Sequence, residues 1–407
     1  MPGGAGRGAR TVSHLAQGAE GRAFRLPGWH LIIVLAVVLW AGLALGASIA
    51  VLRQPGRSIF DVYRDAAAHW WAAEPLYGPG MRAFVYLTSA PLIFTPFAAL
   101  GQPLDDLAWR VFSVAVFLWG VFRLVRVVRP SGAGVAMAAI MLLILPVAGV
   151  DVQRGQATVA MAGWVFLGAA DAAGRRWILA ALWFCLALAL KPLALVPLLL
   201  FAAAFPPLRL PLTVGVVLVL AVPFLHPDPF YVAAQDVAMV RTLTHAADLG
   251  VTRFNDIGMM LHRFGIDLPH TALLALRAAA ALAALALTVV TARRAATPAR
   301  ALVVLAIAMA YLMLFNPRTE LGSYLGLAAV IGVFMVRDEH VPWTARVWPG
   351  AMILAMGTQA YGEWIYRPTD VWLKPFLALL FVVWLADGVL RPPAAPRLLG
   401  GATPAER

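Results

Sequence analysis

Long apolar segments separated by short polar stretches recur along the whole chain. An isolated helix needs about 20 apolar residues to cross a bilayer, and a shorter one can cross where neighbouring helices bury it. Several segments of this chain reach about 20 residues, and the others are somewhat shorter. The pattern predicts an all-α polytopic membrane protein with about 12 transmembrane helices, at residues 30–52, 107–122, 134–149, 157–170, 178–190, 192–205, 211–225, 271–291, 301–315, 321–336, 348–362 and 371–388.

One further apolar block, Phe84–Gly101, contains Pro91 and Pro96, which disrupt a continuous helix. If this block does not span, the segments on the side of the N-terminus hold 18 of the 32 Lys and Arg but 6 of the 20 acidic residues, leaving 14 of each on the other side. The whole formal charge of +12 then lies on one side, as the positive-inside rule expects of a cytoplasmic face. We therefore interpret the block as a re-entrant or interfacial segment within the first outer loop.

This topology divides the chain into a basic cytoplasmic tail (1–29), a single transmembrane catalytic domain (30–390) and a C-terminal cytoplasmic tail (391–407), with both termini inside. The outer loops are 53–106, which we expect to carry interfacial helices, and 150–156, 226–270, 316–320 and 363–370. The cytoplasmic connections are short and basic, so only the outer face has enough chain to build a site. We interpret the excess positive charge as a mark of the cytoplasmic side, where it contacts anionic lipid. No nucleic-acid-binding motif accompanies it.

Composition agrees with the pattern. The chain is 62% apolar and 13% charged, against about 45–50% and 25% in soluble domains, which excludes a soluble enzyme. The segment Leu31–Leu52 follows a tail with four arginines and is longer than the hydrophobic core of a signal peptide, so we expect a retained first helix. Cys185 is the only cysteine and allows neither an intramolecular disulfide nor a cysteine-based metal site.

The first outer loop places Asp61 about nine residues after the first span, among aromatic residues. A carboxylate near apolar surface is a candidate general base. It could equally be a helix N-cap paired with Arg57 or Arg64. Asp65 would share a helical face with it, as a substrate-binding group or as a solvated partner for Arg64.

Further polar residues gather at other outer connections. Arg154 and Gln156 suit a phosphate or sugar hydroxyl, or simply meet lipid headgroups. Lys191 at the end of a span could snorkel or could bind an anion. Arg318 could hold a phosphate or pair with Glu320. The loop 226–270 contains the polar residues His226, His245, Asp248, Asn255, Asp256 and His262. It lacks the i, i+4 histidine pair of a helical zinc site, so a metal site stays open but is not indicated.

Taken in order, these motifs resemble glycosyltransferase family 87, the polyprenol-phosphate-mannose-dependent α-mannosyltransferases of the glycosyltransferase-C superfamily. The resemblance extends from Leu31 to about Val336 and is carried by Asp61 in the long outer loop and by YGPGMRAFVYLTSAPLIFTPFAAL, GQATVAM, LALKP and NPRTE. The chain departs from the family where Tyr86-Leu87-Thr88 replaces a Tyr-Pro-Pro pattern, and where Gly322 and Ser323 stand near a histidine motif of some members. These departures leave the sugar open.

The resemblance implies a glycosyltransferase-C-like fold in a bacterial cytoplasmic membrane. It also implies transfer of mannose or another hexose from a polyprenyl-phosphate donor to a lipid or glycan acceptor at the outer face. Asp61 would be the general base of this inverting transfer, and no cofactor or metal would be needed. The substrate-binding candidates are Asp65, Tyr86, Arg154, Gln156, Lys191, Arg318 and Glu320.

Two other functions remain open. A secondary transporter can also have twelve helices and both termini inside, although its binding groups would sit at the bilayer midplane. A non-enzymatic scaffold or flippase partner is the third possibility. Replacement of Asp61 by Asn separates them, because only an enzyme would lose turnover.

Overall fold

All regular structure in the described part of the chain is helical. The computed structural model describes residues 28–80, 82–245, 254–337 and 344–391. Its first half comprises α1 (Gly28–Arg53), η1 (Pro55–Arg57), α2 (Phe60–Trp71), α3 (Ala90–Ala98), α4 (Leu104–Val128), α5 (Ala133–Arg154), α6 (Ala157–Ala173), α7 (Trp177–Leu190), η2 (Pro192–Ala194) and α8 (Leu195–Ala204). The second half comprises η3 (Pro206–Leu208), α9 (Arg209–Ala221), η4 (Val222–Leu225), α10 (Pro229–His245), α11 (Ile257–Arg263), α12 (His270–Arg294), α13 (Thr297–Phe315), η5 (Leu321–Tyr324), α14 (Leu325–Val336), α15 (Thr344–Met356), η6 (Thr358–Ala360), α16 (Glu363–Thr369) and α17 (Leu373–Leu390).

Seven of these helical segments are long and apolar enough to cross a membrane, which confirms a polytopic membrane protein. They are His30–Arg53, Leu104–Val128, Ala133–Arg154, Pro206–Leu225, His270–Arg294, Thr297–Phe315 and Leu373–Leu390. Four shorter apolar helices cover Ala157–Ala173, Trp177–Leu190, Pro192–Ala204 and Leu321–Val336. The remaining predicted span, 348–362, coincides with α15, which ends at Met356, and with η6. The count of twelve spans therefore stays a prediction.

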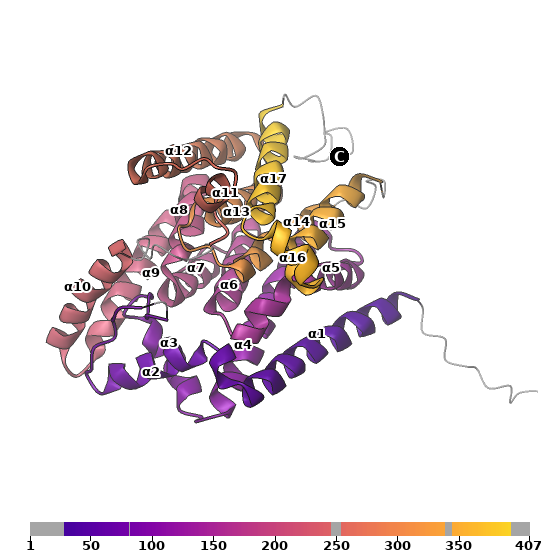
Figure 1. The fold of residues 1–407 in the computed structure, drawn as a ribbon. Helices are drawn as coiled ribbons and strands as arrows, with labels where there is room; N and C mark the ends of the chain where they lie inside the picture. Colours follow the sequence, from indigo (N-terminus) through magenta and orange to yellow (C-terminus); the bar gives the residue numbers. More distant parts are fainter. Residues whose placement is uncertain (1–27, 81, 246–253, 338–343, 392–407) are drawn as a thin grey trace, which may run out of the picture.

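The core of the bundle lies around α6 and α13. Every residue of α6 from Ala157 to Ala172 is buried, so its lack of a polar face follows from its central position. Gly163 lets α4 come close, because a Cβ there would lie 2.7 Å from the Cα of Phe117. Small residues permit such close backbone contact between membrane helices. Figure 1 shows α6 within the bundle and α1 extending along one side of it.

The ambiguous block Phe84–Gly101 forms α3, which has nine residues. At 1.5 Å per residue it is about 14 Å long, less than half the hydrocarbon thickness of about 30 Å. It packs on α2 and on the start of α4 (Figure 1). Its length agrees with an interfacial or re-entrant segment. The two predicted tails lie almost wholly outside the described residues, as do Asp248 and part of the loop 226–270.

Candidate functional site

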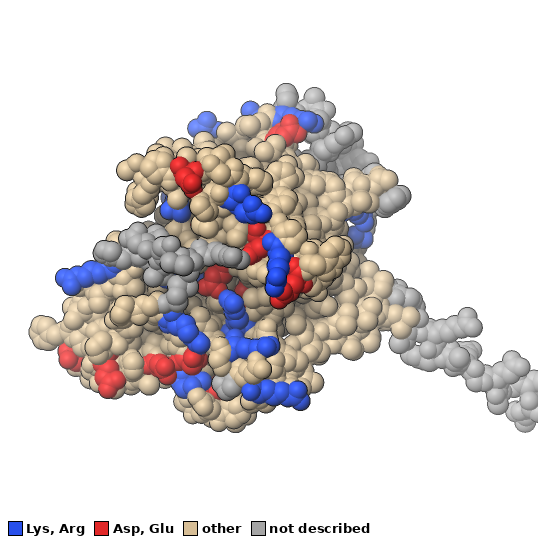
Figure 2. All heavy atoms as spheres, viewed as in Figure 1, with Lys and Arg blue, Asp and Glu red and all other residues tan. Residues whose placement is uncertain are grey.

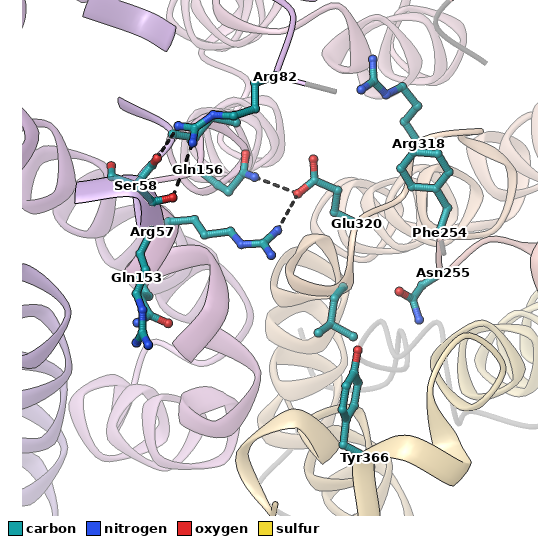
Figure 3. Close-up of a pocket in the computed structure, with 14 residues that line it drawn as sticks. Arg57, Ser58, Arg82, Gln153, Gln156, Phe254, Asn255, Arg318, Glu320 and Tyr366 are labelled. Carbon is teal, nitrogen blue, oxygen red and sulfur yellow. Dashed lines mark hydrogen bonds and ion pairs between the residues drawn. The ribbon is translucent and has the colours of Figure 1, made fainter. Parts of the chain in front are cut away.

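The largest polar cavity lies where the start of α2, the end of α5 and the start of η5 meet. Its volume is about 660 Å³. Figure 3 shows polar side chains from these separate segments facing one another across it. Charged side chains gather around a hollow in the middle of the molecule, whereas most of the visible surface is uncharged (Figure 2). The lining residues are Gly56, Arg57, Ser58, Ile59, Arg82, Gln153, Arg154, Gln156, Phe254, Asn255, Arg318, Glu320, Leu321 and Tyr366.

Backbone hydrogen bonds fix the segment before α2 to the end of α5. The N–H of Ile59 donates to the carbonyl of Arg154 at 2.9 Å. From α4, the indole of Trp109 donates to the carbonyl of Gly155 at 2.8 Å, and Arg110 Nε donates to that of Val152 at 2.8 Å. The last carbonyls of a helix have no partner within it, and a guanidinium there also matches the helix dipole. The end of α5 is thereby held against both α2 and α4.

Arginines dominate the cavity. Arg57, Arg82, Arg154 and Arg318 line it together with a single acidic residue, Glu320. Glu320 accepts a hydrogen bond from Gln156 Nε2 at 2.8 Å and lies 3.4 Å from Arg154 Nη1 (Figure 3). The excess of positive charge suits a phosphate group, which accepts several charge-assisted hydrogen bonds at once.

Two of these arginines have no carboxylate partner in the described chain. Within the described residues, neither Arg57 nor Arg318 has a carboxylate within ion-pair distance. The sequence left a pair between Arg318 and Glu320 open, but Glu320 is bound by Arg154 and Gln156 instead. An anion bound in the cavity would therefore meet cations that no carboxylate neutralises.

Asp61 lies in the first turn of α2, beside this cavity. Both of its carboxylate oxygens accept from Arg82 Nη2, at 2.5 and 2.6 Å, and the same nitrogen donates to the carbonyl of Ser58 at 2.7 Å. The pair is accessible, since the Asp61 and Arg82 side chains are 44% and 48% exposed. The sequence pointed to Arg57 or Arg64 as the partner; Arg64 pairs with Asp105 instead. Asp61 is therefore held by a residue that itself faces the arginine-rich cavity.

A cluster of buried aromatic side chains packs against α2. The Tyr63 ring stacks on Phe94 with centroids 4.3 Å apart. Its hydroxyl lies 2.8 Å from that of Tyr86 and accepts from the N–H of Ala157 at 3.1 Å. Burial raises the pKa of Tyr63 well above its ordinary value, so this hydroxyl stays protonated. The cluster fixes the helix that carries Asp61.

The opposite wall is built by the segment before α11. The N–H of Asn255 donates to the carbonyl of Thr319 at 2.8 Å, and the Tyr324 hydroxyl donates to the carbonyl of Asn255 at 2.8 Å. Asp256 caps α11 by accepting from the N–H of Met259 at 2.9 Å. Burial raises the pKa of Asp256. These contacts hold Asn255 against the loop that carries Arg318.

The structure brings together four of the predicted substrate-binding residues and separates three. Arg154, Gln156, Arg318 and Glu320 line the cavity. Asp65 is exposed on α2 and does not line this cavity. Tyr86 is buried in the aromatic cluster. Lys191 donates to Thr158 Oγ1 at 2.6 Å, and its Nζ lies 5.7 Å from the centre of the Tyr86 ring.

Sequence reasoning missed Arg57 and Arg82 as parts of the cavity. Arg57 was considered only as a partner for Asp61, and Arg82 stands in the segment YGPGMRAF without any periodic pattern. The glycine-rich setting of Arg82 and its position in the longest outer loop were the available signals. In the described residues no group of three His, Cys, Asp or Glu side chains is placed to hold a metal ion; the expectation of a metal-free site stays a prediction.

Comparison with known proteins identifies the family of the chain. The family model for glycosyltransferase family 87 matches residues 84–317, which is more than half of the chain. Comparison with curated proteins finds no match. The matched range contains five of the fourteen residues that line the cavity: Gln153, Arg154, Gln156, Phe254 and Asn255. The chain therefore belongs to glycosyltransferase family 87 and is a membrane glycosyltransferase.

Proposed function

We propose that this glycosyltransferase moves a hexose, such as mannose, from a polyprenyl-phosphate donor to an acceptor hydroxyl at the outer face of a bacterial cytoplasmic membrane. One observation carries the proposal: a cavity lined by four arginines and one acidic residue lies beside Asp61 in a chain built of apolar helices. A phosphate on a lipid carrier is the anion that such a place suits, because the lipid stays among the helices while the charge meets the guanidinium groups.

The reaction is a single displacement. The acceptor oxygen forms a bond to the anomeric carbon of the donor while the bond from that carbon to the phosphate oxygen breaks. The bonding electrons leave with the polyprenyl phosphate, and Asp61 takes the proton of the acceptor hydroxyl. Attack from the side opposite the leaving group inverts the anomeric centre. General-base assistance of this kind contributes about 10²–10⁴-fold in rate.

The arginines stabilise the charge that grows on the leaving phosphate. Arg57 and Arg318 have no carboxylate partner in the described chain and supply net positive charge. Preorganised donors aimed at developing charge account for much of the rate in such sites. Arg82 has a further role, because it contacts Asp61 and lines the cavity. When the donor phosphate binds, it competes with Asp61 for this guanidinium and frees the carboxylate to act as a base.

Charge placement supports an outer site. The loops that carry the cavity residues belong to the side with equal numbers of basic and acidic residues, opposite the basic connections. The reaction needs no redox chemistry and no cofactor beyond the lipid-linked sugar. We count Lys191, Tyr86 and Asp65 as candidates that support the site from outside the cavity wall.

The test is transfer from radiolabelled polyprenyl-phosphate mannose by the protein in membranes. Asp61→Asn removes the base without changing its size, so transfer should fall by about 10²–10⁴-fold. The donor should still bind, and bind more tightly, because Asn competes less strongly for Arg82. Asp267→Asn is the matched control, because Asp267 is exposed and far along the chain on the other outer loop. Transfer by Asp61→Asn at the wild-type rate would show that this carboxylate is not the base.

A second measurement identifies the acceptor. Mass spectrometry of membrane glycolipids from a deletion strain should show a glycan shortened by one hexose. Unchanged glycolipids, together with no transfer from any polyprenyl-phosphate sugar by the wild type, would overturn the proposed function itself.

A further inference from the structure

Two ionisable side chains are buried next to the wall of the arginine-rich cavity and take no part in the chemistry proposed above. Lys374, the second residue of α17, is 2% exposed, and Asp151, near the end of α5, is 3% exposed. Both helices are long and apolar enough to cross a membrane. A charge buried in such a helix is costly and often marks a functional position. The two residues therefore indicate a role beyond packing.

Lys374 contacts the loop that carries Arg318 and Glu320. Its Nζ donates to the carbonyl of Leu321 at 2.7 Å, and Leu321 lines the cavity directly after Glu320. The ammonium also lies 5.9 Å from the centre of the Tyr324 ring, within the range of about 6 Å for a cation–π contact. A hydrogen bond from a charged donor is roughly twice as strong as a neutral one. The lysine therefore ties the start of η5 to α17.

Three consecutive residues of this loop are each held by a different segment. A backbone N–H just before α11 donates to the carbonyl of Thr319, and the Gln156 amide donates to Glu320, both at 2.8 Å. Lys374 holds the third residue, and of these three donors it is the charged one. Arg318 directly precedes the three residues. The position of its guanidinium in the cavity therefore depends on a backbone that these contacts fix.

Asp151 faces the same turn from α5. A Cβ added at Gly322 would overlap Asp151 Oδ1, so the absence of a side chain there lets η5 come close to the carboxylate. The other carboxylate oxygen, Oδ2, is buried and accepts no hydrogen bond in the described chain. A buried carboxylate of this kind is destabilising unless a positive charge lies near. Among the described cations that interact with Asp151, Lys374 is the most deeply buried.

We propose that Lys374 and Asp151 position the loop that carries Arg318, so that its guanidinium meets the donor phosphate in the cavity. Lys374 is a positioning residue, because it binds the Leu321 carbonyl and does not line the cavity itself. The inference rests on the proposed function, which assigns Arg318 to the donor phosphate. It extends the site to α17, which lies beyond the residues that match the family model.

A purely structural role predicts a different outcome. If the two charges only stabilised the fold, removal of both together would restore stability and activity in parallel, since buried opposite charges can often be replaced by neutral residues. Positioning predicts that stability and donor binding separate. The hydrogen bond to Leu321 is lost with the lysine, whether or not Asp151 still carries its charge.

The test compares Lys374→Met with the double variant Asp151→Asn/Lys374→Met. Each is assayed in membranes with varied radiolabelled polyprenyl-phosphate mannose, and its thermal unfolding is followed in detergent. Lys374→Met should raise the KM for the donor about tenfold, which is about 1.4 kcal/mol, and should lower the unfolding midpoint because the Asp151 charge loses its partner. The double variant should recover the midpoint while its KM stays raised. Arg391→Met, which removes an exposed charge at the other end of α17, is the control and should change neither.

A second measurement follows the loop directly and needs no activity. Cys185 is the only cysteine, so Cys185→Ala gives a background in which Arg57→Cys and Arg318→Cys carry a pair of nitroxide spin labels across the cavity. Lys374→Met should change the dipolar broadening between the two labels. Gly322→Ala should change it as well, because its Cβ has no room beside the carboxylate of α5.

An unchanged donor KM in Lys374→Met would overturn the inference, as would a double variant in which the KM and the midpoint recover together. Unchanged dipolar broadening in both loop variants would also overturn it. If Lys374→Met alone fails to fold, the KM of the double variant decides: a raised value supports the inference and the wild-type value overturns it. Failure of the proposed function gives another pattern, in which the wild type transfers no sugar while the spin labels still respond to Lys374→Met.

Discussion

The hydroxyl of Tyr63 joins the helix that carries Asp61 to the start of α6, and its removal has a cost that the structure specifies. Tyr63→Phe keeps the ring on Phe94 but deletes the oxygen that lies 2.8 Å from the Tyr86 hydroxyl and accepts from the N–H of Ala157. Two buried polar groups lose their partner. Each such loss costs about 1–3 kcal/mol, so the variant should be less stable by roughly 2–6 kcal/mol.

The same geometry predicts non-additive behaviour. Tyr86→Phe alone leaves the Tyr63 hydroxyl bonded to Ala157, and should cost only about 1 kcal/mol. In the double variant only the N–H of Ala157 is unpaired, so it should be more stable than Tyr63→Phe alone by about 1 kcal/mol. The added substitution would therefore recover stability.

The free energy of unfolding can be measured by titration of dodecyl sulfate into mixed micelles, with tryptophan fluorescence as the signal. Tyr77→Phe is a suitable control, because its hydroxyl donates to the carbonyl of Tyr86 at a half-buried position and takes no part in the Tyr63 contact. Purely additive losses in the double variant, or a loss below about 0.5 kcal/mol for Tyr63→Phe, would refute the argument that this hydroxyl satisfies two buried groups.

Three further results are expected. Arg57→Ala and Arg318→Ala should each raise the KM for the donor by about 10- to 100-fold, since a charge-assisted hydrogen bond is worth about 1.5–3 kcal/mol. Steady-state kinetics with varied donor concentration would measure this change. An unchanged KM would show that the substituted arginine does not bind the donor phosphate. Gly163→Ala should destabilise the protein by about 1–3 kcal/mol, because its Cβ would overlap the α4 backbone, whereas Gly149→Ala has free space around it and should not alter thermal unfolding in detergent. Asp256→Ala should cost about 1 kcal/mol through loss of the α11 cap, while Asp256→Asn keeps the cap. Because burial raises the folded-state pKa of Asp256, the wild type should lose stability as pH rises through that pKa. Thermal melting at several pH values should show this loss in the wild type and not in the Asn variant.

Much of the helical architecture was predictable because a bilayer leaves few alternatives. Backbone groups in hydrocarbon must be bonded within the segment, so each long apolar run had to be a helix. In Phe84–Gly101, Pro91 stands in the first turn of the nine-residue helix α3 and Pro96 lies inside it. The family resemblance likewise came from ordered short motifs that survive in sequence. Helix boundaries were less accurate where a segment is short, as at α15, because apolar composition alone does not mark where a kinked helix ends.

The candidate site was predictable only in part. Arg154, Gln156, Arg318 and Glu320 could be named from the sequence because each stands at the end of an apolar run, on the side that the charge distribution assigns to the exterior. The partner of Asp61 could not be named, because Arg82 lies 21 residues away in an irregular loop. Lys191 was chosen on the same ground and Tyr86 from the family resemblance. Lys191 instead contacts Thr158, and Tyr86 lies in the aromatic cluster.

The amino-acid sequence by itself determined that the chain is built of apolar membrane helices, because hydrophobicity acts locally along a chain. It also predicted unequal charge on the two sides of the membrane. Only the tertiary structure decided which polar residues share a space. The arginine-rich cavity depends on how the start of α2 meets the end of α5. That contact joins residues almost a hundred positions apart, and such pairing is set by packing of whole helices rather than by any local pattern.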